Sequence, residues 1–262
     1  MDAVGTFVLA VVLSVGFMSG VFAVGRQLRR FDIIDAAWGF VFIVIAFGAL
    51  LAHTLMDGQD ITWAQFAVIG TVTVWGARLA THIGHRVAKT TQEDPRYTNI
   101  RSKWASNTDA MVFWRIYMVQ ALLAVLVSTP VLVVMMSTEV LLPMFVVLGL
   151  LVWAVGFVIE SVADLELDAF VDRHPGKLMT IGLWKYSRHP NYFGEIVQWW
   201  GIGLMSLSVV HGWVGLIGPL VLTFLLLFVS GIPPTERRLS RKEGWGAYKI
   251  RTSALLPLPP KK

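Results

Sequence analysis

Long apolar runs constrain the fold of this chain more than any other feature of its sequence. A membrane-spanning helix needs about 20 mostly apolar residues, and runs of that kind recur along the 262 residues, separated by short polar segments. Only 15% of the residues are charged, against about 25% in soluble domains. We therefore expect an all-α membrane protein. The expected spans are 3–24, 33–55, 63–84, 111–136, 141–163, 192–210 and 213–230.

The positions of lysine and arginine predict the topology. Loops alternate across a membrane, and cytoplasmic loops are enriched in these residues. With the first loop in the cytoplasm, all 22 fall on the cytoplasmic side: 3 in 26–30, 7 in 78–115, 4 in 173–188 and 8 in 237–262. This predicts seven transmembrane helices, with the N-terminus outside and the C-terminus inside. The net charge of +5 is then a topology signal, and we expect no nucleic-acid partner.

Neither a repeat nor a linker divides the chain, so we expect one membrane domain over 1–262. The apolar run at 3–25 is interpreted as a retained span, because it is too long for a signal peptide and lacks a basic start. There are no cysteines, which excludes disulfides, Fe–S clusters and cysteine nucleophiles. The histidines near 82–85 have no carboxylate that completes a metal site, so we expect no metal.

The densest polar cluster is Ile181–Gly201, IGLWKYSRHPNYFGEIVQWWG. Asn191 and Glu195 are four residues apart at the start of the sixth span, so their side chains share a helical face. The alternative is an interfacial anchor, in which Trp, Tyr and Arg lie at the lipid headgroups. An anchor does not need an amide, an imidazole and a carboxylate set so closely around Pro190. We therefore expect this face to bind the polar part of a ligand.

Two places near the second and third spans hold candidate residues. Asp35 lies about one turn into its span, where a carboxylate is costly unless it is paired or faces a polar cavity. Trp75, Arg78 and His82 are spaced to share one face, and a guanidinium there can meet a phosphate. The alternatives are that Asp35 pairs with a loop arginine and that Arg78 extends to the headgroups.

Three further polar segments follow the same logic. The loop EDPRY, followed by Arg101, places arginines beside a proline turn. They can contact a phosphate or form an internal Glu–Arg pair, which is the more common case. Asp164 and Asp168 are one helical turn apart at the end of the fifth span and can bind hydroxyls or lie at a solvated helix end. The tail carries Glu236, which can cover the same face or simply belong to a basic membrane-proximal segment.

The segment GLWKYSRHPNYFGEIVQWWG resembles the signature of the membrane steroid 5α-reductase family, in its bacterial branch. The resemblance covers roughly the C-terminal half and extends more weakly to Asp35 and to Trp75–Arg78. Related RHPxYxGE segments occur in sterol C14 reductases and in isoprenylcysteine carboxyl methyltransferases. The motif therefore indicates a superfamily that uses two cofactors, NADPH and S-adenosylmethionine.

The reductase branch implies NADPH at the cytoplasmic side and hydride transfer to the β-carbon of a lipophilic 3-oxo-Δ4-steroid-like enone. Asp35 lies where the family has a catalytic Glu, with Ile34 in place of its Gln, and Trp75 replaces the catalytic Tyr. A tryptophan N–H donates a hydrogen bond but passes on no proton, so Asp35 would have to supply it. The cofactor contacts that the resemblance and the loop patterns imply are Arg78, Arg96, Arg101, Asp164, Tyr186, Arg188, His189, Asn191, Tyr192, Glu195, Glu236, Arg237 and Tyr248, most of them within 164–257.

Two other functions stay open at this point. The tail pattern of Gly246, Tyr248, Arg251 and Pro257 resembles the methyltransferase C-terminus equally well, so a membrane methyltransferase using S-adenosylmethionine is the alternative. A transporter or lipid-binding protein would carry polar residues at mid-membrane on several spans. The many arginines favour NADPH, which has three phosphates. We expect a monomer in the bacterial inner membrane, with membrane lipids and a lipophilic small molecule as partners.

Overall fold

The computed structural model describes residues 2–104 and 108–261. Within these residues the structure is helical, and its β pairing is a single parallel bridge between Ser187 and Ser253. Six described helical stretches are long and apolar enough to cross a membrane. They are Ala3–Leu28, Ile33–Met56, Trp63–Ala88, Thr108–Val127, Pro143–Arg173 and Gly212–Leu239. The expectation of an all-α fold with several helices long and apolar enough to cross a membrane is confirmed for the described residues.

The expected sixth span differs from the others. It corresponds to α9, Pro190–Ser206, which has 17 residues and is shorter than the 20 or so that a straight span needs. The residues after it, up to the helical turn η3 (Gly212–Leu216), form turns rather than continuing the helix to 210. The seventh span and the orientation of the termini therefore stay predictions.

The chain packs as two compact units. The first is Met1–Val146 with Met205–Ile217, and the second is Val147–Leu204 with Gly218–Lys262. Each unit is described by itself below. The expectation of one domain over 1–262 stays a prediction.

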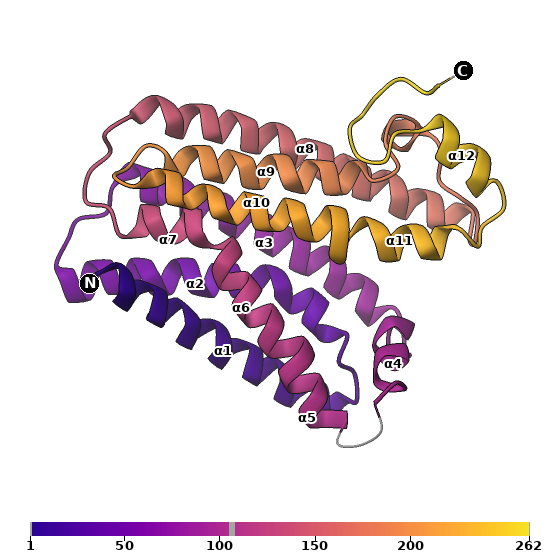
Figure 1. The fold of residues 1–262 in the computed structure, drawn as a ribbon, viewed down its shortest axis with the longest axis horizontal. Coiled ribbons are helices and arrows are strands. Elements are labelled where there is room, and N and C mark those ends of the chain that lie inside the picture. Colours follow the sequence, from indigo (N-terminus) through magenta and orange to yellow (C-terminus); the bar gives the residue numbers. More distant parts are fainter. Residues whose placement is uncertain (1, 105–107, 262) are drawn as a thin grey trace. The chain divides into compact units, whose positions relative to one another are not determined.

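In the first unit, α2 (Ile33–Asp57) packs against both α1 (Ala3–Leu28) and α3 (Trp63–Ala88) (Figure 1). Gly39 of α2 and Gly76 of α3 allow this close approach, because a Cβ on Gly39 would collide with the Gly76 backbone. The remaining elements are α4 (Pro95–Arg101), α5 (Thr108–Val112), the π-helical η1 (Phe113–Tyr117), α6 (Met118–Val127), α7 (Thr129–Met135) and η3.

In the second unit, glycines bring the long helix α8 (Pro143–Arg173) and α9 together. A Cβ at Gly194 would lie 2.5 Å from the Glu160 nitrogen, and one at Gly156 would lie 2.6 Å from the Gln198 nitrogen. Gln198 donates a hydrogen bond to Glu160 inside this contact, as small residues and polar side chains do between membrane helices. The other elements are η2 (Gly182–Lys185), α10 (Ile217–Phe224), η4 (Leu225–Val229), α11 (Ile232–Leu239) and α12 (Trp245–Arg251).

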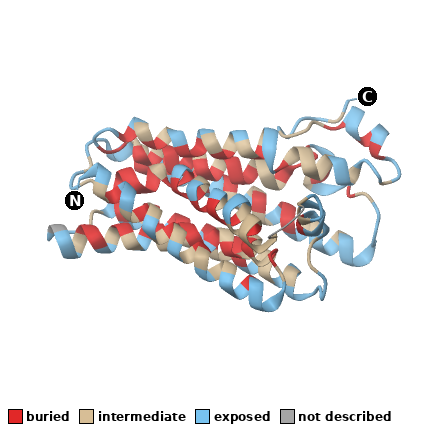
Figure 2. Cartoon of the chain, turned by 60° about the horizontal axis from the view of Figure 1, so that its bottom comes forward, coloured by how far each residue is buried: buried red, intermediate tan, exposed pale blue. Residues whose placement is uncertain are grey.

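Buried and exposed residues lie on different sides of many of the helices. Figure 2 shows buried residues along one side of many helices and exposed residues along the other. Many exposed side chains are large and apolar, such as Phe7, Leu51 and Phe228. In a soluble monomer, apolar surface in such quantity is rare. It is the surface that lipid chains cover in a membrane protein.

Candidate functional site

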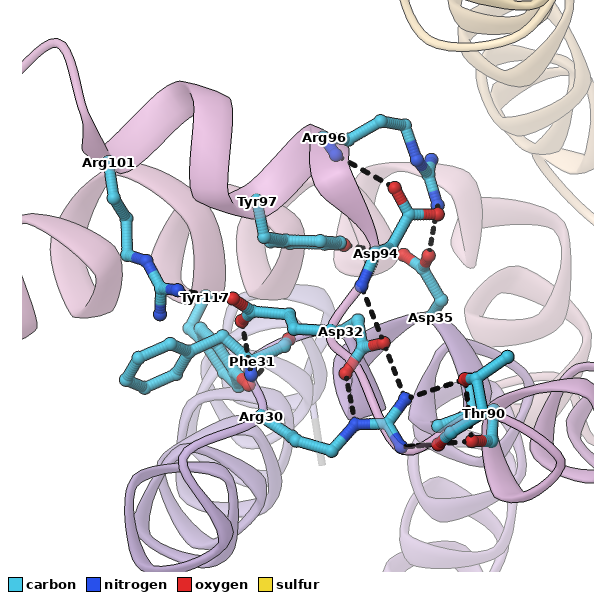
Figure 3. A network of polar contacts seen from close by, with 12 residues as sticks. Arg30, Phe31, Asp32, Asp35, Thr90, Asp94, Arg96, Tyr97, Arg101 and Tyr117 are labelled. Atoms are coloured by element: carbon cyan, nitrogen blue, oxygen red, sulfur yellow. Dashed lines mark hydrogen bonds and ion pairs between the residues drawn. The ribbon is translucent and has the colours of Figure 1, made fainter.

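A network of charged side chains fastens the segment before α4 to the start of α2 (Figure 3). Asp32 is 2% exposed. It accepts hydrogen bonds from the Arg30 guanidinium at 2.8 and 3.2 Å and from the Asp94 backbone N–H at 3.0 Å. Glu93 accepts from the Phe31 N–H at 2.8 Å. All these groups belong to the first unit, and we call the set, with Asp35, Arg96, Tyr97 and Arg101, the Asp35 network.

Asp35 lies at the part of this network where a proton donor and a carboxylate meet. Its two carboxylate oxygens accept hydrogen bonds from the Tyr97 hydroxyl at 2.5 Å and from Arg96 at 2.6 Å. Burial, and then the charge of Asp35 and the hydrogen bond to it, raise the pKa of Tyr97 well above its ordinary value. The result is a buried phenol that stays protonated and is held against a carboxylate.

Tyr97 is the residue that sequence reasoning missed. It was visible only as one polar residue of the EDPRY loop, and no spacing rule connects it to a carboxylate 62 residues earlier. The available signal was chemical: a tyrosine supplies the phenol that is absent at position 75. In the structure a phenol, that of Tyr97 on α4, lies beside Asp35, and α3 carries Trp75.

Among the other candidate residues of the first unit, two lie on α3 and two are arginines that pair with carboxylates. Trp75 is fully buried and packs edge-to-face on Phe42, with ring centroids 5.3 Å apart. Arg78 is half-buried on the same helix. Arg101 pairs with Glu93, and Arg96 pairs with Asp94 at 3.0 Å as well as with Asp35. The structure thus contains the internal Glu–Arg pair considered above, while any phosphate contact by these arginines stays a prediction.

In the second unit, α8 and α9 bring together part of the expected polar face. The Asn191 amide nitrogen donates to Asp164 at 3.2 Å. Its amide oxygen is buried and has no hydrogen-bond partner among the described residues. Glu195 lies one turn further along α9 and is 9% exposed. An unpaired buried acceptor costs free energy, so this amide oxygen is suited to a donor from a ligand.

The rest of the motif packs around this face. Tyr192 stacks on His189, with ring centroids 5.3 Å apart, and its hydroxyl lies 3.1 Å from that of Thr235. Burial lowers the pKa of His189 to about 4, against the opposing effect of Glu236. The neutral imidazole is therefore the form present near pH 7. The remaining predicted residues divide by exposure: Tyr186 and Arg237 are exposed, and Arg188 and Tyr248 are buried.

Comparison with known proteins places the chain in a family. Residues 21–252 match the model of a family described as "Protein of unknown function (DUF1295)". The chain belongs to this family. Over 84 residues it is also 37% identical to 3-oxo-5-alpha-steroid 4-dehydrogenase 1 from Bos taurus. That match covers 30% of this chain and 30% of the bovine protein, and no solved structure matches.

The bovine match supports the resemblance stated from the motif. The relative is named as a dehydrogenase of 3-oxo steroids. That name is the name of an oxidoreductase, and the match covers less than a third of each of the two chains. It names no methyltransferase, so the comparisons do not favour that alternative.

We predict that Asp32→Ala destabilises the protein by about 3 kcal/mol, because it removes a buried carboxylate that pairs with Arg30 and accepts from the Asp94 N–H. Thermal unfolding in detergent measures this. The matched control is Asp109→Ala, which breaks a 3.0 Å pair with Arg26 whose side chains are 47% and 68% exposed. The control should cost less than about 1 kcal/mol. Equal losses in the two variants would show that the Asp32 pairing contributes nothing special.

We predict that acid weakens the fold through His189. In the unfolded chain its pKa returns to about 6.5, so between pH 6.5 and about 4 the unfolded state binds more protons. Stability therefore falls as the pH falls through this window, by about 3 kcal/mol in total. His189→Gln should flatten that part of the pH profile of the unfolding temperature. An unchanged slope in the variant would assign the acid sensitivity to other groups.

Proposed function

We propose that this protein is an NADPH-dependent reductase of a C=C bond conjugated to a ketone, in a lipophilic 3-oxo-Δ4-steroid-like substrate. The observation that carries the proposal is the match to the bovine protein, whose name describes dehydrogenation of a 3-oxo steroid at C4. The reverse of that reaction is reduction of the conjugated enone. The motif GLWKYSRHPNYFGEIVQWWG supports the same family at the level of its bacterial branch.

The Asp35 network supports a role in proton donation. Hydride addition at the β-carbon of an enone leaves negative charge on the ketone oxygen, and a positioned acid stabilises it. Tyr97 is the acid in this proposal, because its phenol is buried and protonated. Its single proton, which Asp35 accepts in this structure, turns to the ketone oxygen when substrate binds. Asp35 orients the phenol, and Arg96 adds positive charge beside it. Trp75 has no proton to pass on and is left with a packing or hydrogen-bonding role.

The second unit supports the cofactor assignment in part. NADPH, when bound, supplies the hydride. The buried amide oxygen of Asn191 and the carboxylates of Asp164 and Glu195 fit hydroxyl and carboxamide donors of such a molecule. For its phosphates, Arg237 and Arg238 are exposed cations on α11.

We also propose seven spans, with α9 as the seventh, the N-terminus outside, the C-terminus in the cytoplasm and the cofactor groups on the cytoplasmic side of a bacterial inner membrane. The support is the distribution of all 22 lysines and arginines, which the positive-inside rule explains only if α9 crosses. A tilted or locally thinned bilayer accommodates a short helix at modest cost.

We predict that the purified protein oxidises NADPH when given a Δ4-3-ketosteroid. Tyr97→Phe should lower kcat about 100-fold, because it removes the proton donor, and should leave NADPH affinity intact. The control is Tyr117→Phe, whose hydroxyl donates to the Phe31 carbonyl at 3.0 Å; this variant should keep its kcat. Absorbance of NADPH and mass spectrometry of the steroid product are the measurements.

Two results would contradict these assignments. If Trp75→Phe abolishes turnover and Tyr97→Phe does not, the acid is misassigned. If the protein transfers labelled methyl groups from S-adenosylmethionine and ignores NADPH, the methyltransferase alternative is correct.

We predict that single cysteines introduced into this cysteine-free chain at positions 177 and 210 label from opposite sides of the membrane. Lys177→Cys should react with an impermeant maleimide only after the cells are opened, and Val210→Cys should react in intact cells. Both positions are exposed in the structure. Labelling from the same side would mean that α9 does not cross.

A further inference from the structure

Arg188 lies two residues before α9 and is one of the side chains that the family resemblance assigns to the cofactor. In the structure it is 7% exposed. Its Nε and Nη2 donate to the same oxygen of Glu236 at 2.9 and 2.6 Å, and Nη1 donates to the carbonyls of Lys249, at 3.0 Å, and Thr252. A guanidinium has five N–H donors, so most of its capacity is used inside the protein.

The backbone beside Arg188 is fastened to the same region. The Arg188 N–H donates to the Ser253 carbonyl at 2.8 Å, and Ser187 and Ser253 form the parallel bridge. The Ser187 hydroxyl donates to the Leu255 carbonyl at 2.7 Å, and the Leu258 N–H donates to the Tyr186 carbonyl at 3.1 Å. Residues 252–261, which we call the strap, therefore follow the loop that precedes α9.

The helix before the strap is fixed as well. The buried Tyr248 hydroxyl of α12 donates to the Trp184 carbonyl at 2.6 Å, and burial raises the pKa of that phenol. The Arg188 guanidinium lies 5.7 Å from the Trp245 ring centre, a cation–π distance. One side chain thus joins α11, α12 and the strap to the start of α9.

The polar face of α9 begins immediately after this junction. Asn191 and Tyr192 are three and four residues beyond Arg188, and the Tyr192 hydroxyl contacts Thr235, the neighbour of Glu236 on α11. A shift of α11 or of the strap would therefore move the walls around Asn191. A helix start that is anchored through a partly buried ion pair has little freedom to adjust by itself.

We infer that Arg188 is a positioning residue. With Glu236 it holds the strap and α11 against the start of α9, and it thereby shapes the polar face of α9 at Asn191 without touching the molecule bound there. The part of this inference that concerns ligand binding rests on the proposed function, because it takes NADPH as the ligand of that face. The part that concerns the strap does not.

Hydrogen exchange in detergent, without nucleotide, tests the strap. The variants are Arg188→Lys, which keeps the charge and loses the planar fork, and Glu236→Gln, which keeps the shape and loses the charge. The amides of residue 188 and Leu258, which donate across the contact between the strap and the loop before α9, should exchange about tenfold faster in both variants than in the wild type. The control variant is Arg251→Gln, which changes an exposed arginine at the C-terminal end of α12. Hydrogen exchange in the strap should not change in this control. Unchanged exchange in both variants overturns the inference, and Glu236→Gln decides the matter if Arg188→Lys fails to fold.

NADPH affinity separates positioning from direct contact. Each variant should raise the Kd about tenfold, the double variant should be no worse than either single one because the two residues act as a unit, and kcat at saturating NADPH should be retained. Weaker binding by Arg188→Lys with an unchanged strap would mean that Arg188 contacts the cofactor, and would overturn the inference. If the wild-type protein binds no NADPH, the proposed function fails and with it the ligand-binding part, while the exchange measurement still decides the strap.

Discussion

A charge placed among apolar helices must find hydrogen-bonding partners, and this requirement organises the polar parts of the structure. Removing a carboxylate or a guanidinium from water costs several kcal/mol unless partners replace the lost hydration. Asp32 meets the requirement through Arg30 and the Asp94 backbone. Arg188 meets it through Glu236 and two backbone carbonyls. In each unit the loops lie where they do because these buried charges need them.

The same requirement changes how the arginines are interpreted. From the sequence, their number favours a cofactor that carries phosphates. In the structure, Arg101 is neutralised by Glu93, Arg96 by two aspartates and Arg188 by Glu236. The first-unit network sets three arginines, at 30, 96 and 101, against four carboxylates, at 32, 35, 93 and 94. A count of basic residues is therefore weak evidence for phosphate binding when acids lie equally close in the fold.

The sequence predicts the apolar helices well, because a run of about 20 apolar residues has few other solutions in a membrane. It also places Asn191 and Glu195 on one face, since helical spacing is local. It fails where residues far apart in the chain meet. Tyr97 reaches Asp35 across 62 residues, and the carbonyl of Thr252 reaches Arg188 across 64. No periodicity encodes such pairs. The length of α9 was also overestimated, because apolar residues continue past Ser206 although the helix ends there.

The distance along the chain between Arg188 and its partners also bears on how the protein is made. Glu236, Lys249 and Thr252 follow it by 48, 61 and 64 residues, so the ribosome delivers α9 to the membrane well before the groups that neutralise the charge in front of it. Until they arrive, that guanidinium is better solvated at the membrane surface than buried. The polar end of α9 should therefore reach its final place late in biosynthesis, after α11 and α12 have emerged.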